Sequence, residues 1–313
     1  MKKYLFFLLT ITVLVSSCVK DEDKDKNDDN TTATTAKLKF KFKFDPNQER
    51  LDNFGQPSTI PAGNAAQTPD FRGLSAHFIE LVKDEFVPVQ TGEMVYKGAE
   101  TTVGGDKAID FEQAVVEDEN IVFLEVPIKD ITPGTYKHIR VSVTYQQLDI
   151  KYDVINIPGL SQSLSDESGR MDVFVGFNTY LKEVTPIQKT ETINANKKQG
   201  FWAFETDLKS PYNNYNTLSS GQAPVGATTV VNPFANTAPI TEGSCLVSGS
   251  FDNALNITGN ETEDIEVTLS FSINNSVEWK DTNGNGKMDV DVGNNSVETM
   301  VDMGLRGLKA FVN

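Results

Sequence analysis

Hydrophobic and charged residues alternate without a break from Lys37 to Phe44. Leu38, Phe40, Phe42 and Phe44 fall on one face of an extended chain and four lysines on the other, because successive side chains of a strand point to opposite faces. The segment therefore predicts a β-strand with one buried face. Its lysine row has two interpretations, protection of a sheet edge or a stripe that binds an anionic ligand, and we expect the edge strand.

Further segments combine alternation with the β-branched and aromatic residues that favour strands. They are Ala76–Val82, Ile121–Pro127, Tyr136–Tyr145, Met171–Val175, Phe201–Asp207, Leu246–Phe251 and Ile265–Ile273. No segment carries a long apolar stripe at helical spacing, and residues 108–117 are expected to form one short helix. Residues 45–70 and 209–244 are rich in Gly, Pro, Asn and Thr, which predicts long loops.

These elements predict an all-β fold, an Ig-like antiparallel β-sandwich with long loops. Residues 37–313 are long enough for one large domain or two smaller ones, and we prefer one. A boundary between two domains would be easiest to place at Thr185–Lys198. In the segment around Trp202, aromatic residues occupy both faces, which predicts a central strand; a stacking platform for a sugar or another ligand is the alternative.

The N-terminus has the composition of an export signal. A basic start at Lys2 and Lys3 precedes an apolar run of eleven residues from Leu5 to Val15, which is too short to span a bilayer as a permanent helix. Val15-Ser16-Ser17-Cys18 resembles the lipobox of bacterial lipoproteins. That resemblance implies a signal peptide at residues 1–17, acylation of Cys18, and a membrane as the partner through the lipid anchor. An ordinary signal peptide with a coincidental cysteine is the alternative.

Residues 18–36 lack apolar periodicity and are expected to form a lipidated, acidic, disordered tether. Lys20-Asp21-Glu22-Asp23 resembles the acidic export signal of Bacteroidota surface lipoproteins, which implies the cell-surface side of the outer membrane. A plain spacer that faces the periplasm is the alternative. The ligand or protein partner is not indicated by the sequence.

The chain carries a formal net charge of −16, and loss of Lys2 and Lys3 with the signal peptide would make it −18. This acidity argues against nucleic acid as a partner and favours cations. With Cys18 acylated, Cys245 has no disulfide partner among the two cysteines of the chain. We expect Cys245 to be a buried small hydrophobe, with a reactive thiol or metal ligand as the alternative.

The strongest local motif begins at Asp281. Oxygen-bearing residues recur with the spacing of a calcium loop of the EF-hand type, and Gly286 allows the sharp bend at its sixth position. The candidate calcium ligands are Asp281, Asn283, Asn285, Lys287 through its carbonyl, Asp289 and Asp291. Val292 stands where a bidentate glutamate is usual, so Asp291, Glu298 or Asp302 would have to substitute. An Asx- and Gly-rich hairpin turn without metal is the alternative.

The histidines and the catalytic motifs give fewer signals than the calcium loop. His77 shares a strand face with Ile79 and Leu81, so we expect a hydrogen-bonded core histidine; a copper ligand is the alternative. His138 is expected on a polar, solvated face. The sequence has no nucleophile elbow, zinc-protease helix or P-loop, so we expect a protein that is not an enzyme. A hydrolase with paired carboxylates is not excluded by sequence.

Several pieces of the chain, taken in order, resemble the MbnP-like proteins, β-sandwich lipoproteins and periplasmic proteins linked to copper handling. The pieces are Leu38–Phe44, Ser75–Val82, Ile109–Glu112, Pro133–Tyr136 with the strand that follows, and Gln199–Trp202. The resemblance implies the fold, and it supplies no set of metal ligands to carry over. Our leading expectation is a lipid-anchored surface binding or structural module with a calcium-stabilised loop. A copper-handling protein that uses His77 and an extracellular glycan-binding protein or hydrolase are the alternatives.

Changing Cys18 to Ala should release the protein from the membrane fraction, because the substitution removes the atom that would carry the lipid. Fractionation of expressing cells followed by immunoblotting measures this. The variant Cys245→Ala is the matched control and should stay in the membrane fraction. Retention of the Cys18→Ala protein in membranes would show that the lipoprotein interpretation is wrong.

Overall fold

The computed structural model describes residues 36–240, 244–294 and 296–313. The predicted signal peptide, Cys18 and nearly all of the predicted tether lie outside these residues. The described residues all belong to one compact unit. Ala36, expected as the last residue of the tether, is buried, and its carbonyl accepts a hydrogen bond from the Ile128 amide.

Strands and short 3-10 turns make up the regular structure, and the described residues contain no α-helix. The largest sheet has thirteen strands. Nine follow one another in the order β13 (Leu218–Gln222), β12 (Phe201–Thr206), β9 (Leu164–Phe174), β8 (Gly134–Ile155), β14 (Leu246–Ile257), β20 (Leu308–Val312), β15 (Ile265–Ser272), β1 (Lys37–Asp45) and β7 (Val122–Pro127). The other four are β3 (Asp70–Val82), β4 (Glu93–Lys97), β17 (Asp289–Asp291) and β18 (Ser296–Val297).

Two smaller sheets accompany it in the described part of the chain. One contains β11 (Glu191–Lys198), β10 (Asn178–Val184), β6 (Ala108–Asp110) and β5 (Glu100–Thr101), and the other contains β19 (Met300–Asp302), β16 (Val277–Lys280) and β2 (Asn64–Gln67). The 3-10 turns are η1 (Phe111–Gln113), η2 (Ile128–Asp130) and η3 (Asn213–Tyr215). The prediction of an almost purely β fold is therefore confirmed.

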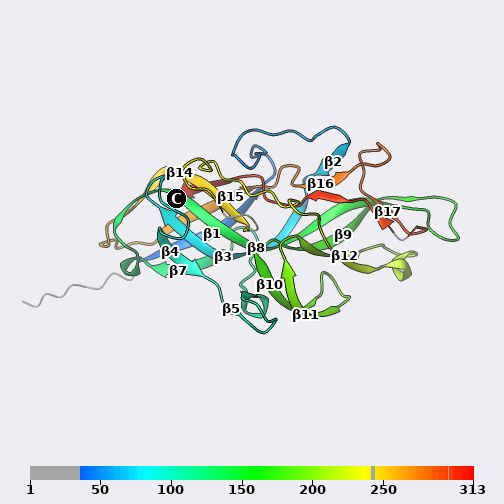
Figure 1. Cartoon of the computed structure of the whole chain (residues 1–313), viewed down its shortest axis with the longest axis horizontal. Helices are drawn as coiled ribbons and strands as arrows, with labels where there is room; N and C mark the ends of the chain where they lie inside the picture. The colour runs from blue at the N-terminus through cyan, green and yellow to red at the C-terminus, as the bar shows by residue number, and fades with distance from the viewer. Residues whose placement is uncertain (1–35, 241–243, 295) are drawn as a thin grey trace, which may run out of the picture. The chain divides into compact units, whose positions relative to one another are not determined.

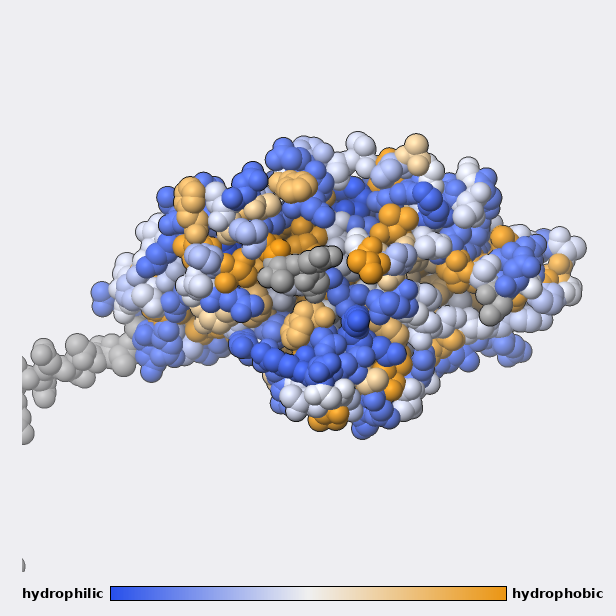
Figure 2. All heavy atoms as spheres, in the orientation of Figure 1, coloured by the Kyte–Doolittle hydropathy of each residue, from blue (hydrophilic) through white to orange (hydrophobic). Residues whose placement is uncertain are grey.

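The main core is one continuous cluster of buried apolar residues, most of them on strands of the large sheet. Leu38, Phe40 and Phe42 of β1 are fully buried in it, as the alternation predicts. A second, smaller cluster lies on the other side of β9 and β12, where Phe174 and Phe201 meet Leu181 of β10. Figure 1 shows β10 and β11 beside this end of the large sheet, and Figure 2 shows that polar residues interrupt the hydrophobic patches on the face drawn.

The edge-strand prediction for Lys37–Phe44 is wrong. β1 pairs with β15 on one side in parallel and with β7 on the other in antiparallel orientation. Each lysine of the row lies within 3.0 Å of a carboxylate oxygen from its own or a neighbouring segment, so the row carries no free positive stripe. These ion pairs are Lys37–Glu125 (2.5 Å), Lys39–Asp264 (2.6 Å), Lys41–Glu266 (2.6 Å) and Lys43–Asp45 (3.0 Å).

Other expectations also need correction. The sheets are mixed rather than purely antiparallel, with parallel pairs β1–β15, β14–β20, β8–β17 and β6–β10. The helix expected at residues 108–117 is instead β6 followed by η1, because Ile109 extends to pair with both β5 and β10. The segments expected to be long loops, residues 45–70 and 209–244, contain β2, η3 and β13. The candidate domain boundary at Thr185–Lys198 contains β11, which belongs to the same compact unit as the rest of the described residues. Trp202 does lie on a central strand, since β12 pairs with both β9 and β13.

Replacing Phe40 with Ala should lower the free energy of unfolding by about 3–5 kcal/mol, because the ring is completely buried and the substitution leaves a cavity. Urea denaturation followed by circular dichroism measures the loss. Lys43→Ala on the opposite face of the same strand should cost much less, because its side chain is 46% exposed and pairs only with Asp45. Equal losses in the two variants would contradict the assignment of the faces.

Candidate metal site

The predicted calcium loop joins β16 to β17, near the end of the large sheet where β17 pairs with β8 (Figure 1). It begins directly after Lys280, and Asp289 is the first residue of β17. Trp279 of β16 is 2% exposed, and its indole Nε1 donates a hydrogen bond of 3.1 Å to the Lys287 carbonyl. The core thus holds both ends of the loop.

Asp281 organises the backbone of the loop. Its Oδ1 accepts hydrogen bonds from the amides of Gly284 (2.9 Å) and Asn285 (3.1 Å), and its Oδ2 accepts one from Gly286 (3.0 Å). Gly284 and Gly286 have φ angles of +73° and +72°, which glycine adopts without steric cost. The chain therefore curls around the carboxylate of the first position, as the ligand spacing requires.

The two asparagines turn their side chains into the same loop. Asn283 Oδ1 accepts from the Asn285 amide (3.0 Å), and Asn285 Oδ1 accepts from the Lys287 amide (2.7 Å). Their Nδ2 atoms both donate to Oδ2 of Asp289, at 2.5 and 3.1 Å. The side chains of the third, fifth and ninth positions therefore converge on one point.

Asp289 is the most constrained acid of the loop. It is 4% exposed, and its Oδ1 is buried without a hydrogen-bond partner among the described residues. Burial raises the pKa of its carboxyl; the hydrogen bond from Asn283 lowers it, and the charge of Glu298 raises it again. A buried carboxylate oxygen with an open lone pair is costly to a folded protein unless a proton or a cation meets it.

Glu298, which follows β18, closes the loop from outside its sequence. Its Oε1 accepts from the amide (2.7 Å) and hydroxyl (2.8 Å) of Thr282, and its Oε2 accepts from the Asp289 amide (3.1 Å). Of the three acids considered as substitutes at the twelfth position, Glu298 is the one that bonds to residues 281–289 in the part of the chain that the structure describes. The local sequence around Glu298 does not indicate that it contacts the calcium loop, because the β17–β18 hairpin brings it next to that loop.

Asp291 and Asp302 have other partners. Asp291 accepts hydrogen bonds from the side chains of Asn156 (2.9 Å) and Asn294 (2.7 Å). Asp302 belongs to a buried cluster described below. Across the described residues, no three or more His, Cys, Asp and Glu side chains are gathered as a metal-binding group. The candidate site therefore depends on amide and backbone oxygens as well as carboxylates.

His77 is a buried histidine with one clear partner. It is 5% exposed, and its Nε2 lies 3.1 Å from Glu100 Oε1, while Lys107 Nζ lies 2.8 Å from the other Glu100 oxygen. Burial lowers the pKa of His77, and the charge of Glu100 opposes that shift. The hydrogen-bonded core histidine expected from sequence is confirmed.

The two histidines do not meet. His138 on β8 lies opposite Val82 of β3, five residues beyond His77, or roughly 15 Å along a strand. His138 is only partly exposed, since its ring packs 4.4 Å from that of Phe234 and its Nδ1 contacts Ser250. The expectation of a solvated His138 is thus met only in part.

Cys245 is 1% exposed, and burial raises the pKa of its thiol to about 12. A thiol that stays protonated at neutral pH is a poor nucleophile and a poor metal ligand. The prediction of a buried small hydrophobe is confirmed.

Two buried acids on β9 and β12 are relevant to the hydrolase alternative. Asp172 Oδ1 accepts from the Tyr145 hydroxyl (2.7 Å) and from Gln147 (3.0 Å). Glu205 accepts three backbone amides of the loop that follows β10, at 2.8 to 3.1 Å, from Ile187, Gln188 and Lys189. Asp172 thus bonds to the adjoining strand β8, whereas Glu205 fastens the loop after β10 to the sheet.

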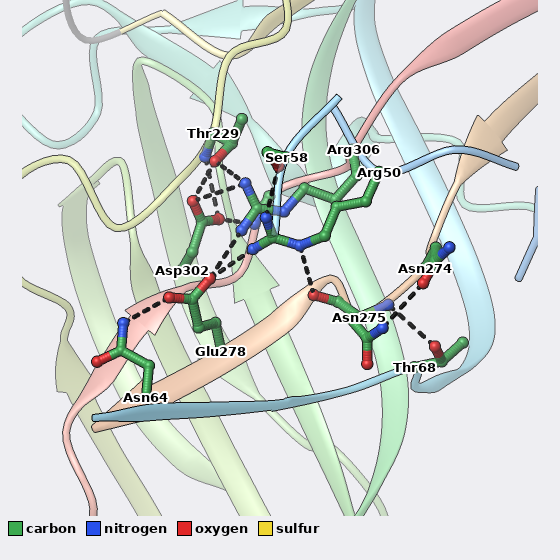
Figure 3. Close-up of polar contacts among 11 residues, drawn as sticks. Arg50, Ser58, Asn64, Thr68, Thr229, Asn274, Asn275, Glu278, Asp302 and Arg306 are labelled. Atoms are coloured by element: carbon green, nitrogen blue, oxygen red, sulfur yellow. Dashed lines mark hydrogen bonds and ion pairs between the residues drawn. The ribbon is translucent and has the colours of Figure 1, made fainter. Parts of the chain in front are cut away.

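A buried polar cluster is built around Glu278 of β16 (Figure 3). Glu278 Oε2 lies 2.5 Å from Arg50 Nη2 and 3.2 Å from Arg306 Nη2, and Asp302 lies 3.3 Å from Arg306. Thr229 bonds to both Asp302 and Arg306. Two positive and two negative groups balance in this cluster, and it joins four distant segments of the chain.

Comparison of the chain with models of protein families, with curated proteins and with solved structures finds no match in any of the three. In the part of the chain that the structure describes, no helix is long and apolar enough to cross a membrane. The resemblance to MbnP-like proteins and the lipid anchor therefore stay predictions.

Replacing Glu278 with Ala should lower the free energy of unfolding by about 3–5 kcal/mol, because two buried arginines lose the carboxylate that they share. Chemical denaturation measures the change. Asp207→Ala, which breaks the exposed pair with Lys209, is the control and should cost less than about 1 kcal/mol. A loss at Glu278 as small as the control's would contradict a structural role for this cluster.

Proposed function

We propose that this protein is a lipid-anchored, non-catalytic binding or structural module of the outer membrane, exposed at the cell surface, in which residues 281–289 bind calcium. The proposal takes the domain to be a β-sandwich of the Ig-like or MbnP-like kind. The observation that carries the calcium assignment is the buried, unpartnered Oδ1 of Asp289 at the point where the side chains of the loop converge.

Calcium suits this loop because it prefers oxygen ligands in a flexible arrangement. Asp281, Asp289 and Glu298 supply carboxylates, and the Lys287 carbonyl keeps a lone pair beside its bond from Trp279. Asn283 and Asn285 would turn their amides to present oxygen in place of the Nδ2 atoms that now face Asp289. Glu298 would then supply the carboxylate that a glutamate usually provides at the twelfth position, where this chain has Val292.

A cation here would connect three segments that the chain separates: the loop, the start of β17 and the residue after β18. Extracellular calcium modules bind with dissociation constants of about 10⁻⁴–10⁻³ M. At about 2 mM calcium such a site adds about 0.6–1.8 kcal/mol to the free energy of unfolding. Calcium would therefore stabilise residues 281–298, the calcium loop with the β17–β18 hairpin, which we call the C-terminal hairpin, rather than perform chemistry.

Calcium should change the fluorescence of Trp279, because its indole is bonded to the carbonyl proposed as a ligand. We would titrate calcium into the mature chain, residues 18–313, with Cys18→Ser in place of the lipidated cysteine and Trp202→Phe so that Trp279 is the sole tryptophan. Asp281→Ala should abolish the change. Asp291→Ala, in the same hairpin but bonded to Asn156 and Asn294, should preserve it.

To complete this test, the protein is exposed to calcium and copper together, and elemental analysis measures how much of each metal it binds. One calcium per chain, lost in Asp281→Ala, supports the proposal. No bound calcium, or binding that survives Asp281→Ala, overturns it. Tight copper that disappears in His77→Ala would make metal handling the leading function instead.

A further inference from the structure

A cavity of about 190 Å³ lies where β9, β12 and the end of β13 meet Met288 and residues 297–300. Trp202 and Met171 line it from β12 and β9, Met300 from β19, and Met288 from the candidate calcium loop. The three methionines are each no more than 5% exposed. The pocket and the candidate metal site share Glu298, which lines the pocket and also bonds to the calcium loop.

Trp202 gives the pocket a flat aromatic wall. It faces the main core together with Phe204 and is only partly buried. Its partner across β13 is Gly221, where an added Cβ would lie 2.8 Å from the indole Cζ2. The glycine therefore lets the indole lie close against the neighbouring strand, which fixes the plane of the ring.

The methionines make much of the remaining wall apolar and polarisable. Thioether groups pack against aromatic rings with a gain of about 0.3–1.5 kcal/mol per contact, and their unbranched chains adapt to a ligand's outline. An apolar protein cavity of about 150 Å³ is large enough to take benzene. A cavity of about 190 Å³ lined in this way therefore has room for one small ring system.

The charged groups of the lining restrict the chemical class of the ligand further. Among the described residues that border the cavity, Glu298 is the one ionisable group, and no lysine, arginine or histidine is present. An anionic ligand would have no counter-charge there. A sugar would stack on Trp202 but needs several hydrogen-bonding partners, and the polar side chains of the described lining are only Gln222, Glu298 and Thr299. The Gln222 amide already donates to the Gln199 carbonyl, and both oxygens of Glu298 already accept hydrogen bonds from the calcium loop.

We propose that this pocket binds a small, uncharged, planar aromatic ring that stacks on Trp202 among Met171, Met288 and Met300. The proposal does not depend on calcium binding by the loop. It assigns the protein a small-molecule site on the same hairpin as the candidate metal site.

Isothermal titration calorimetry with indole as the probe tests the proposal on the mature chain with Cys18→Ser, in EDTA and again in calcium. We expect saturable binding of one indole per chain in at least one of the two buffers. Trp202→Ala should weaken it about tenfold or more, since the stacking partner is lost. Phe86→Ala, at an aromatic residue that is 66% exposed, should leave binding unchanged.

Ala223→Leu is the second variant, because Ala223 lines the cavity and a larger side chain there fills it without removing the tryptophan. It should also weaken binding about tenfold or more, with circular dichroism confirming a folded chain. Indole-3-acetate and methyl glucoside serve as the anionic and sugar probes and should bind at least tenfold more weakly than indole. No indole binding in either buffer, binding that both variants retain, or tighter binding of either comparison probe would overturn the proposal.

Discussion

The strand β8 is the element on which the other strands depend. Over its 22 residues, one edge bonds first to β14 and then to β9, and the other edge bonds to β3 and then to β17. Its inward residues Ile139, Val141 and Val143 are fully buried. The parallel pairing that sets Asp289 opposite Asp153 also fixes where the candidate calcium loop ends, so the site inherits its position from this strand.

Buried ion pairs hold the long connections against this sheet. Glu80 and Arg140 are almost completely buried and lie 3.2 Å apart on neighbouring strands. Arg140 also donates to the carbonyls of Val87 and Pro88, and Glu80 accepts from the Gly92 amide, so the pair fastens the loop between β3 and β4. The Arg50–Glu278–Arg306 cluster does the same for segments near both ends of the described chain. Such pairs specify geometry because leaving either partner unpaired is costly.

The C-terminal hairpin concentrates the features that suggest binding. Met288 belongs to the candidate calcium loop and also lines the apolar pocket, and Glu298 touches the loop and borders the same pocket. The oxygen-rich calcium loop and the methionine-lined pocket therefore share these residues. The long strands behind them supply a rigid support, which a site on loops needs for a defined geometry.

The sequence by itself determined the all-β character, the buried face of Lys37–Phe44, the burial of His77 and Cys245, and the loop that begins at Asp281. These follow from period-two alternation and from local spacing, which act over a few residues. Only the tertiary structure decided that β1 is central, that Glu298 closes the loop, that Glu100 contacts His77, and that three methionines meet Trp202. Each of these depends on partners far apart in the chain, as with Phe40 opposite Val267, and no local pattern encodes which distant strand becomes a neighbour.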